Sequence, residues 1–170
     1  MKQASLVSHS PEETQALGRR LGALARAGDV YLLNGELGAG KTCLTQGIAQ
    51  GLGVKEQALS PSFVIVREYH GCMALYHIDF YRLNNAAEIA SLGIEEYFRA
   101  AGVTVIEWAE KGKEVLPGEN LALVLDHKSD TERGISIEAS GARYEALLGE
   151  LMATACRSGG GQNPEGTGQA

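Results

Sequence analysis

One stretch of the sequence has the residue types and the spacing to hold phosphate. Residues 35–42 read Gly-Glu-Leu-Gly-Ala-Gly-Lys-Thr, which fits the pattern of glycine, any four residues, glycine, lysine and then serine or threonine. Glycines let the backbone curl so that successive N–H groups face phosphate oxygens, and a following helix adds partial positive charge at its start. Lys41 would hold the terminal phosphates of a nucleotide, and Thr42 would turn its hydroxyl to magnesium. The predicted nucleotide contacts here are Gly35, Gly38, Ala39, Gly40, Lys41, Thr42 and Cys43.

A phosphate loop of this kind needs an acidic residue near Thr42 to hold magnesium. Parallel strands bring their carboxyl ends to the sheet edge that carries the loop, so an acid that ends a strand qualifies by position. Asp79, Glu107 and Asp126 each end a strand-like run. We favour Asp79 and Glu107, because Asp126 precedes a polar stretch where aspartate commonly forms a turn. Trp108, the single tryptophan, follows Glu107, and the default role of a lone tryptophan is to plug the end of the core.

Other polar stretches are compatible with a nucleotide site but also with ordinary structure. Ser60 and Ser62 flank Pro61 in a loop that either approaches the terminal phosphate, as switch loops do in GTPases, or simply forms a turn. His77 lies inside a strand-like run, which favours a packed residue over a general base. Residues 127–130 partly fit a guanine-reading motif but lack its asparagine, and a hairpin turn explains them better.

The elements that must position these residues follow from hydrophobic periodicity and from cap and turn signals. Residues 30–34 form an apolar β-forming run before the glycine stretch, and residues 43–52 have the composition of a helix, which is the context that the motif requires. Ser10, Pro11 and Glu13 predict a helix start with a serine cap. The other predicted strands are 4–8, 63–70, 73–79, 103–107, 121–126 and 134–139, and the other predicted helices are 11–26, 84–101 with a break at Gly93 and an end at Gly102, and 142–156.

This order of elements predicts the α/β fold class, with a P-loop NTPase-like three-layer fold and a mixed, partly antiparallel central sheet. At 170 residues the chain is long enough for one core, so we expect a single domain at 1–156. Residues 157–170 are glycine-rich and polar, which predicts a disordered tail.

Composition limits where the protein works and what it binds. Hydrophobic residues make up 44% of the chain, and no apolar run approaches the ~20 residues of a membrane span. No signal-like apolar segment follows the first residues, so we expect a cytoplasmic protein with no membrane association. The three cysteines are widely spaced, which favours reduced thiols. A net charge of −6 argues against a general nucleic-acid surface, since such surfaces use Lys and Arg to neutralise phosphates.

Taken in order, these motifs resemble those of the TsaE family of bacterial P-loop ATPases, which take part in forming threonylcarbamoyladenosine at position 37 of tRNA. Residues 35–42 resemble the family's phosphate loop, and Ser-Pro-Ser-Phe at 60–63 resembles its Ser-Pro-Thr loop. Residues 76–83 resemble its His-x-Asp-x-Tyr-Arg-Leu segment, and residues 106–110 its Glu-Trp motif. Ser62 departs from the usual threonine, keeping the hydroxyl but losing the methyl group.

The resemblance implies a magnesium-dependent ATPase that is weak alone and depends on partners. It implies that Thr42 and Glu107 ligate magnesium and that Asp79 assists in the metal or water shell. Lys41, Asp79 and Glu107 are therefore the expected catalytic residues.

The resemblance also implies contacts beyond the phosphate loop. Trp108 would border the site or a partner surface, and the nucleotide would touch the chain near Pro11 and at a late hairpin, where Arg133 is the candidate. The implied partners are TsaD-like and TsaB-like proteins, with tRNA reached only through their complex, and ATP hydrolysis would reset that assembly.

Two other functions fit the sequence. A small-molecule or nucleoside kinase shares the phosphate loop, but such enzymes clamp the transferred phosphoryl group with clustered cations. Here the arginines are scattered, apart from Arg19 and Arg20 on the first predicted helix. A nucleotide-dependent binding module, in which hydrolysis is incidental, is the other alternative. Slow ATP turnover that a partner raises would separate an ATPase cycle from a simple clamp.

Overall fold

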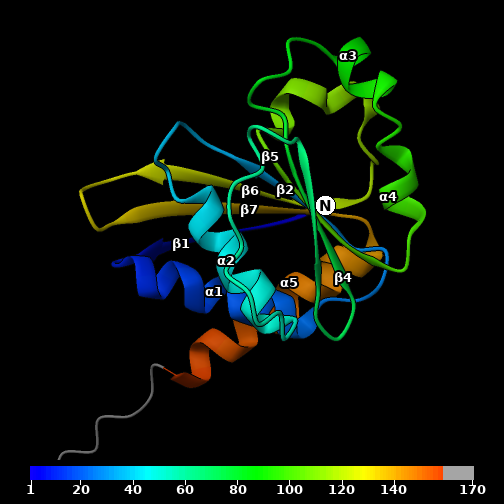
Figure 1. Cartoon of the computed structure of the whole chain (residues 1–170). Helices are drawn as coiled ribbons and strands as arrows, with labels where there is room; N and C mark the ends of the chain where they lie inside the picture. Colours follow the sequence, from blue (N-terminus) through cyan, green and yellow to red (C-terminus); the bar gives the residue numbers. More distant parts are fainter. Residues whose placement is uncertain (159–170) are drawn as a thin grey trace, which may run out of the picture.

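The computed structural model describes residues 1–158, which form a seven-stranded mixed sheet with helices on both faces (Figure 1). This three-layer arrangement confirms the predicted α/β fold class. Of the predicted tail at 157–170, residues 159–170 lie outside the described part of the chain, and residues 157 and 158 belong to helix α5 (Ala142–Ser158). The strands are β1 (Lys2–Ser8), β2 (Val30–Asn34), β3 (Val66–His70), β4 (Ala74–Asp79), β5 (Gly102–Glu107), β6 (Asn120–His127) and β7 (Arg133–Ser140).

The strand order brings several carboxyl ends to one edge of the sheet. The strands run in the order β1-β7-β6-β2-β5-β4-β3. Strand β2 pairs in parallel with β5 and β6, and β5 pairs in parallel with β4. The pairs β1-β7, β6-β7 and β3-β4 are antiparallel, and the last two are hairpins of consecutive strands. The carboxyl ends of β2, β4, β5 and β6 therefore share one edge, where ligands bind in open α/β sheets.

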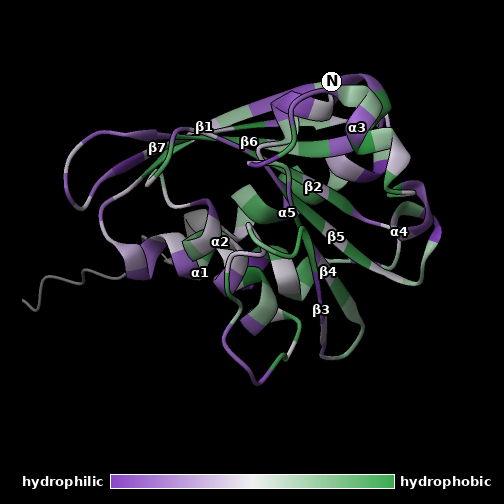
Figure 2. Cartoon of the chain, turned by 45° about the horizontal axis from the view of Figure 1, so that its top comes forward, coloured by the Kyte–Doolittle hydropathy of each residue, from purple (hydrophilic) through white to green (hydrophobic). Residues whose placement is uncertain are grey.

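Long helices cover one face and short helices the other. Helices α1 (Pro11–Leu24), α2 (Lys41–Gly51) and α5 pack on one face, and α3 (Ala86–Ser91), α4 (Glu95–Arg99) and the 3₁₀ helix η1 (Ala109–Val115) lie on the opposite face (Figure 1). The central strands are hydrophobic (Figure 2), and their side chains divide into two buried clusters, one under each helix layer. Within residues 1–158, no helix is both long and apolar enough to cross a bilayer.

Glycines let α1 and α2 touch backbone to backbone. A Cβ atom placed on Gly18 would lie 2.3 Å from the carbonyl oxygen of Leu44, and one on Gly51 would lie 2.2 Å from that of Arg19. Because α2 begins at Lys41, this close contact fixes the helix that carries the end of the glycine-rich loop. The glycines in this contact are Gly18, Gly22, Gly47 and Gly51.

The predicted strand at 63–70 starts too early. Strand β3 begins at Val66, because the Pro61 carbonyl accepts hydrogen bonds from the N–H groups of Val64 and Ile65 and closes a turn there. Ile65 has a positive φ of 68°, which is incompatible with an extended strand.

The predicted role of Gly102 as a helix end is also wrong. Helix α4 ends at Arg99, and Gly102 is the first residue of β5. A Cβ atom on Gly102 would lie 2.6 Å from the carbonyl oxygen of Ala74, so the glycine serves the close approach of β4. Helix η1 was not predicted from the sequence.

Candidate functional site

The glycine-rich loop, residues 35–42, leads from the carboxyl end of β2 into the start of α2. Gly35, Gly38 and Gly40 have φ angles of 140°, 80° and 104°, which residues with a side chain rarely adopt. Gly40 is the N-cap of α2 and has no side chain to bond the first N–H groups of the helix. These N–H groups and the positive end of the helix dipole suit an anion such as phosphate.

Lys41 packs against the loop that precedes it. Its ammonium group donates hydrogen bonds to the carbonyl oxygens of Gly35 (2.6 Å) and Glu36 (2.8 Å) and lies 4.1 Å from the centre of the Trp108 ring. Burial lowers the pKa of this amine, while nearby carboxylates, chiefly that of Glu107, oppose the shift. Within the described residues the lysine forms no ion pair, so its charge is held at the loop by carbonyl dipoles and an aromatic face.

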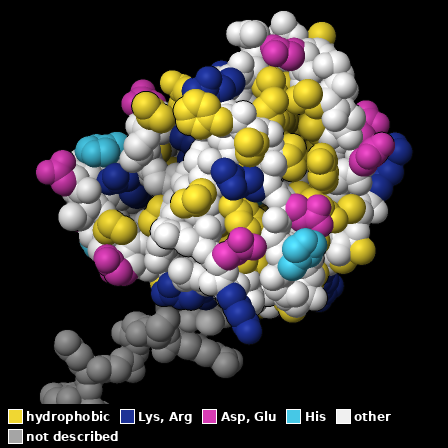
Figure 3. All heavy atoms as spheres, viewed as in Figure 1, with side chains coloured by type: hydrophobic (Ala, Val, Ile, Leu, Met, Phe, Trp, Pro, Cys, Tyr) yellow, Lys and Arg dark blue, Asp and Glu magenta, His cyan; other side chains and the backbone are white. Residues whose placement is uncertain are grey.

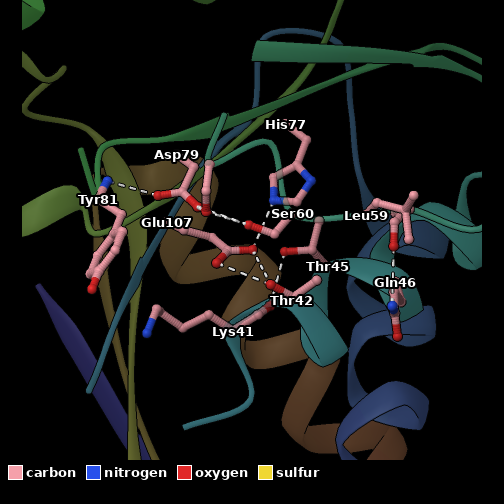
Figure 4. Close-up of polar contacts among 12 residues, drawn as sticks. Lys41, Thr42, Thr45, Gln46, Leu59, Ser60, His77, Asp79, Tyr81 and Glu107 are labelled. Carbon is pink, nitrogen blue, oxygen red and sulfur yellow. Dashed lines mark hydrogen bonds and ion pairs between the residues drawn. The ribbon is translucent and has the colours of Figure 1, made fainter. Parts of the chain in front are cut away.

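Glu107 joins three elements at the end of β5. The hydroxyl of Thr42, in the first turn of α2, donates to the Glu107 carboxylate, at 2.9 Å from Oε1 and 3.2 Å from Oε2 (Figure 4). Nε2 of His77, on β4, lies 2.8 Å from the same Oε1. The parallel register pairs Asp79 with Glu107, so the two favoured acids lie side by side at the sheet edge.

Asp79 holds the loop that contains Ser60 and Ser62. Both serine hydroxyls donate to its Oδ2, at 3.0 and 2.8 Å, and the backbone N–H of Tyr81 donates to its Oδ1 at 2.8 Å (Figure 4). Asp79 is buried, and these bonds offset the loss of water around its carboxylate. The predicted switch-like loop is therefore tied to the end of β4, next to Glu107.

Trp108 adopts a left-handed backbone conformation, with φ 57° and ψ 38°, directly after Glu107. This conformation is strained for a bulky residue and persists only where surrounding contacts enforce it, often at functional sites. Its indole lies 5.1 Å from the ring of Tyr81 and 4.1 Å from the ammonium of Lys41. The residue also packs against the apolar cluster under α3, α4 and η1, so it both closes the core and borders the loop.

Three more predicted contacts lie around the loop. The Cys43 thiol donates to the Pro11 carbonyl (3.4 Å), which sets the start of α1 against the first turn of α2. Burial raises the pKa of the Cys43 thiol. Arg133, at the start of β7, donates to the carbonyl oxygens of Ala39 (3.0 Å) and Gly38 (3.3 Å). Arg133 thus supports the backbone of the loop.

The structure does not bring Asp126 to this site. The residue lies inside β6 rather than in a turn, and its side chain is exposed. Its neighbour Leu125 is buried under the long helices, so the alternation of side chains directs Asp126 to the opposite face of the sheet. Residues 128–132 connect β6 and β7, as the predicted hairpin turn requires.

A comparison of sequences identifies the family. The family described as "Threonylcarbamoyl adenosine biosynthesis protein TsaE" matches residues 8–135, a span that contains the glycine-rich loop, Asp79 and Glu107. The chain belongs to the TsaE family. The resemblance inferred from its motifs is thereby confirmed.

Named relatives and a solved structure agree over most of the chain. It is 45% identical over 152 residues to the tRNA threonylcarbamoyladenosine biosynthesis protein TsaE of Bacillus subtilis (strain 168), which covers 89% of this chain and 95% of the relative. It is 39% identical over 131 residues to the protein of that name from Treponema pallidum (strain Nichols), with coverages of 77% and 97%. The crystal structure of YdiB from Bacillus subtilis matches with a TM-score of 0.80 at 42% identity, covering 91% of this chain and 97% of that one. The TsaE fold therefore extends beyond the site to nearly the whole described chain.

His77 is the residue of this TsaE site whose role the sequence did not reveal. The prediction of a packed strand residue is confirmed, because His77 has no exposed surface on β4. Its contact with Glu107 was not foreseen. The signal for it was alternation, since His77 and Asp79 are two residues apart and therefore face the same side of the strand.

Proposed function

We propose that the chain binds ATP together with Mg²⁺ and hydrolyses it, as a component of tRNA threonylcarbamoyladenosine biosynthesis. The observation that carries the proposal is the 2.9 Å contact between Thr42 and Glu107 at the start of α2. A hydroxyl from the loop and a carboxylate from a neighbouring strand are the hard oxygen donors that Mg²⁺ takes when it also binds nucleotide phosphates. The biosynthetic role is supported by the relatives, which are named for that pathway.

Each residue at the site has its own proposed role. The N–H groups of the loop hold the phosphates, and Lys41 exchanges its bonds to Gly35 and Glu36 for bonds to phosphate oxygens. Asp79, with the serine loop tied to it, orients the attacking water. Bound Mg²⁺ supplies positive charge that stabilises the phosphates as hydrolysis proceeds.

The side-chain oxygens of Thr42 and Glu107 suit Mg²⁺ only when a nucleotide supplies further ligands. Among residues 1–158, no group of three or more His, Cys, Asp and Glu side chains is arranged to hold a metal. Thr42 and Glu107 supply two oxygens, and Mg²⁺ commonly keeps several waters and takes its other ligands from substrate phosphates. We therefore expect weak Mg²⁺ binding by the chain without ATP.

We also propose that protein partners dock beside the site. Leu37 in the glycine-rich loop is 77% exposed, and Phe63 next to the serine loop is 83% exposed, with the Arg82 guanidinium 4.1 Å from its ring. Figure 3 shows one face of the molecule, where hydrophobic side chains gather in groups between single charged ones. Grouped apolar side chains favour a protein contact, and the net charge of −6 disfavours direct tRNA binding. TsaD-like and TsaB-like proteins of the cytoplasm are the proposed partners, with tRNA reached through their complex.

Binding and turnover by the purified chain test the nucleotide site. ATP is titrated by calorimetry with and without Mg²⁺, and phosphate release is followed in parallel. Thr42→Ala and Glu107→Gln should each reduce Mg²⁺-dependent hydrolysis by at least about tenfold while leaving Mg²⁺-free ATP binding near that of wild type. An equal loss of ATP binding without Mg²⁺ would assign these residues a structural role. Absence of ATP binding by the wild type would refute the proposal.

The purpose of hydrolysis is tested with the partners and with tRNA in large excess. Blocking hydrolysis traps one nucleotide state without removing the docking surface. Glu107→Gln should therefore support about one round of modification per complex, while wild type continues. Repeated rounds by a variant verified to be inactive toward ATP would favour the nucleotide-dependent binding module instead.

A further inference from the structure

His77 is an unusual residue for its surroundings. It has no exposed surface, it shares its face of β4 with fully buried Leu75, and it pairs in register with fully buried Val105 on β5. An aliphatic side chain would fill such a position without polar atoms that need partners. Nδ1 of His77 is buried and has no hydrogen-bond partner among the described residues. The imidazole therefore lowers the stability of the fold, and a function of its other nitrogen would explain why histidine occupies this position.

That other nitrogen, Nε2, contacts the Glu107 carboxylate. The side chains of His77 and Glu107 are 0% and 4% exposed, and Nε2 lies 2.8 Å from Oε1. An ionised carboxylate can only accept hydrogen bonds, so Nε2 carries the hydrogen and donates it. Thr42 also lies closer to Oε1 (2.9 Å) than to Oε2 (3.2 Å). Oε1 thus receives the two shorter bonds, and Oε2 retains more capacity to bind another group.

We infer that His77 is a positioning residue, whose Nε2–H fixes the Glu107 carboxylate so that Oε2 remains available to Mg²⁺. In Figure 4, His77 and Lys41 lie on opposite sides of Glu107, so the histidine acts from the side away from the loop lysine. Hydrogen bonds to the far side of a ligating group set its orientation and so its affinity for metal. The inference rests on the proposed function, because it requires Glu107 to be a metal ligand.

Three substitutions separate positioning from packing. His77→Gln carries an amide N–H to about the place of Nε2, whereas the amide of His77→Asn reaches only about as far as Nδ1. His77→Leu fills the apolar surroundings and donates nothing. Positioning requires the donor at Nε2, so Gln should replace His and the other two should not.

The readouts are Mg²⁺ dependence and thermal stability. The affinity for adenylyl imidodiphosphate is measured by calorimetry with and without Mg²⁺, and the Mg²⁺ concentration for half-maximal ATP hydrolysis is measured separately. His77→Asn and His77→Leu should raise that concentration by about tenfold or more, the usual effect of losing such a supporting bond, and His77→Gln should recover most of the loss. Affinity for the analogue without Mg²⁺ should match that of wild type in all three. A packing role alone would lower the melting temperature and leave the Mg²⁺ requirement unchanged.

Equal impairment of His77→Gln and His77→Asn would overturn the inference, as would a wild-type Mg²⁺ requirement in His77→Leu. If the leucine variant fails to fold, the Gln and Asn pair decides the matter, since both are small amides that differ in reach. Analogue binding by the wild type that does not respond to Mg²⁺ would refute the proposed function and this inference with it. A normal wild-type response with unaffected variants would refute the inference alone.

Discussion

Two buried polar clusters lie near opposite ends of strand β2, and they are built differently. The site cluster, at the carboxyl end, consists of Lys41, Thr42, His77, Asp79 and Glu107. The anchor cluster, at the amino end, consists of Asp29, Tyr31, Arg143 and Tyr144. The site cluster gathers charged groups beside the glycine-rich loop, and the anchor cluster connects the last helix to the middle of the sheet.

The anchor cluster satisfies its charges completely. Nε and Nη2 of Arg143 donate to the two carboxylate oxygens of Asp29 at 3.0 and 2.7 Å, and the hydroxyl of Tyr31 donates to the same carboxylate. The bond to Asp29 raises the pKa of Arg143, and burial raises that of Tyr31. Tyr144 accepts the N–H of Val30 at the start of β2. Every member thus has a partner within the protein, as stability requires.

The site cluster leaves polar capacity unused. Lys41 contacts carbonyl oxygens and an indole instead of a carboxylate, and Nδ1 of His77 is unpartnered among the described residues. Protein interiors rarely tolerate such groups without a reason. The two clusters therefore differ in pairing: every member of the anchor cluster has a partner within the protein, whereas the site cluster holds its lysine without a counter-charge and leaves one buried histidine nitrogen unpartnered among the described residues.

The largest expected effect comes from removing the unpaired cation. Lys41→Ala should lower ATP hydrolysis by on the order of a hundredfold or more, because it deletes the side-chain charge that is proposed to bind the phosphates. Phosphate release by the purified variant measures this. The matched control is Lys111→Ala, since Lys111 lies 5.8 Å from the same indole but donates to the carbonyls of Tyr81 and Leu83. Turnover retained by Lys41→Ala would show that the charge of Lys41 is not needed for ATP hydrolysis.

Removing a charge from the anchor cluster should cost stability and spare function. Asp29→Asn leaves Arg143 mostly buried without its counter-charge, which should lower the free energy of unfolding by about 3 kcal/mol. For a chain of this size that corresponds to a drop in melting temperature of roughly 6–12 °C, measured by circular dichroism. At temperatures below the unfolding transition, the affinity of the variant for ATP should equal that of wild type. Glu145→Gln is the control, because its ion pair with the N-terminus is exposed and should contribute little.

A smaller effect is expected at the loop tied to Asp79. Ser62→Ala removes one hydroxyl that bonds the Asp79 carboxylate, and a bond to a charged group is worth about 1.5 kcal/mol, or roughly tenfold in turnover. Ser62→Thr keeps the hydroxyl and should keep wild-type turnover. Steady-state hydrolysis of ATP by the two variants makes the comparison. Equal turnover in the two variants would show that the hydrogen bond from Ser62 to Asp79 does not contribute to catalysis.

The smallest effect concerns pH. Because burial lowers the pKa of Lys41, the free protein loses this charge at a lower pH than an ordinary lysine would, so kcat/KM for ATP should decline as the solution becomes alkaline. The anchor cluster should behave differently. The pKa of Tyr31 is raised above its ordinary value of 10, so its contribution to stability is fully present below that value and is lost only as the pH rises through the folded-state pKa. Activity and melting profiles measured in parallel from about pH 7 up to pH 10 should therefore diverge, and profiles that fall together would contradict this.

The local features of the fold were largely readable from the sequence. The glycines at residues 35–42 predicted a curled loop between a strand and a helix, and Gly35, Gly38 and Gly40 have the positive φ angles of such a loop. The serine cap was predicted from Ser10 and Glu13, and the Ser10 hydroxyl accepts the Glu13 N–H at 3.1 Å. Strand β2 matches its predicted limits. Such features depend on side chains acting on their own stretch of backbone, so a single sequence contains the necessary information.

What joins distant residues was decided by the tertiary structure. Three acids qualified by their position at the end of a strand. The parallel register of β4 and β5 sets Asp79 beside Glu107. The alternation of side chains along β6 directs Asp126 to the other face of the sheet. The bond between His77 and Glu107 spans 30 residues of sequence, and that between Asp29 and Arg143 spans 114. Periodicity predicts which face of an element is buried, but the neighbour across that face depends on strand order and register, which arise only when the whole chain packs.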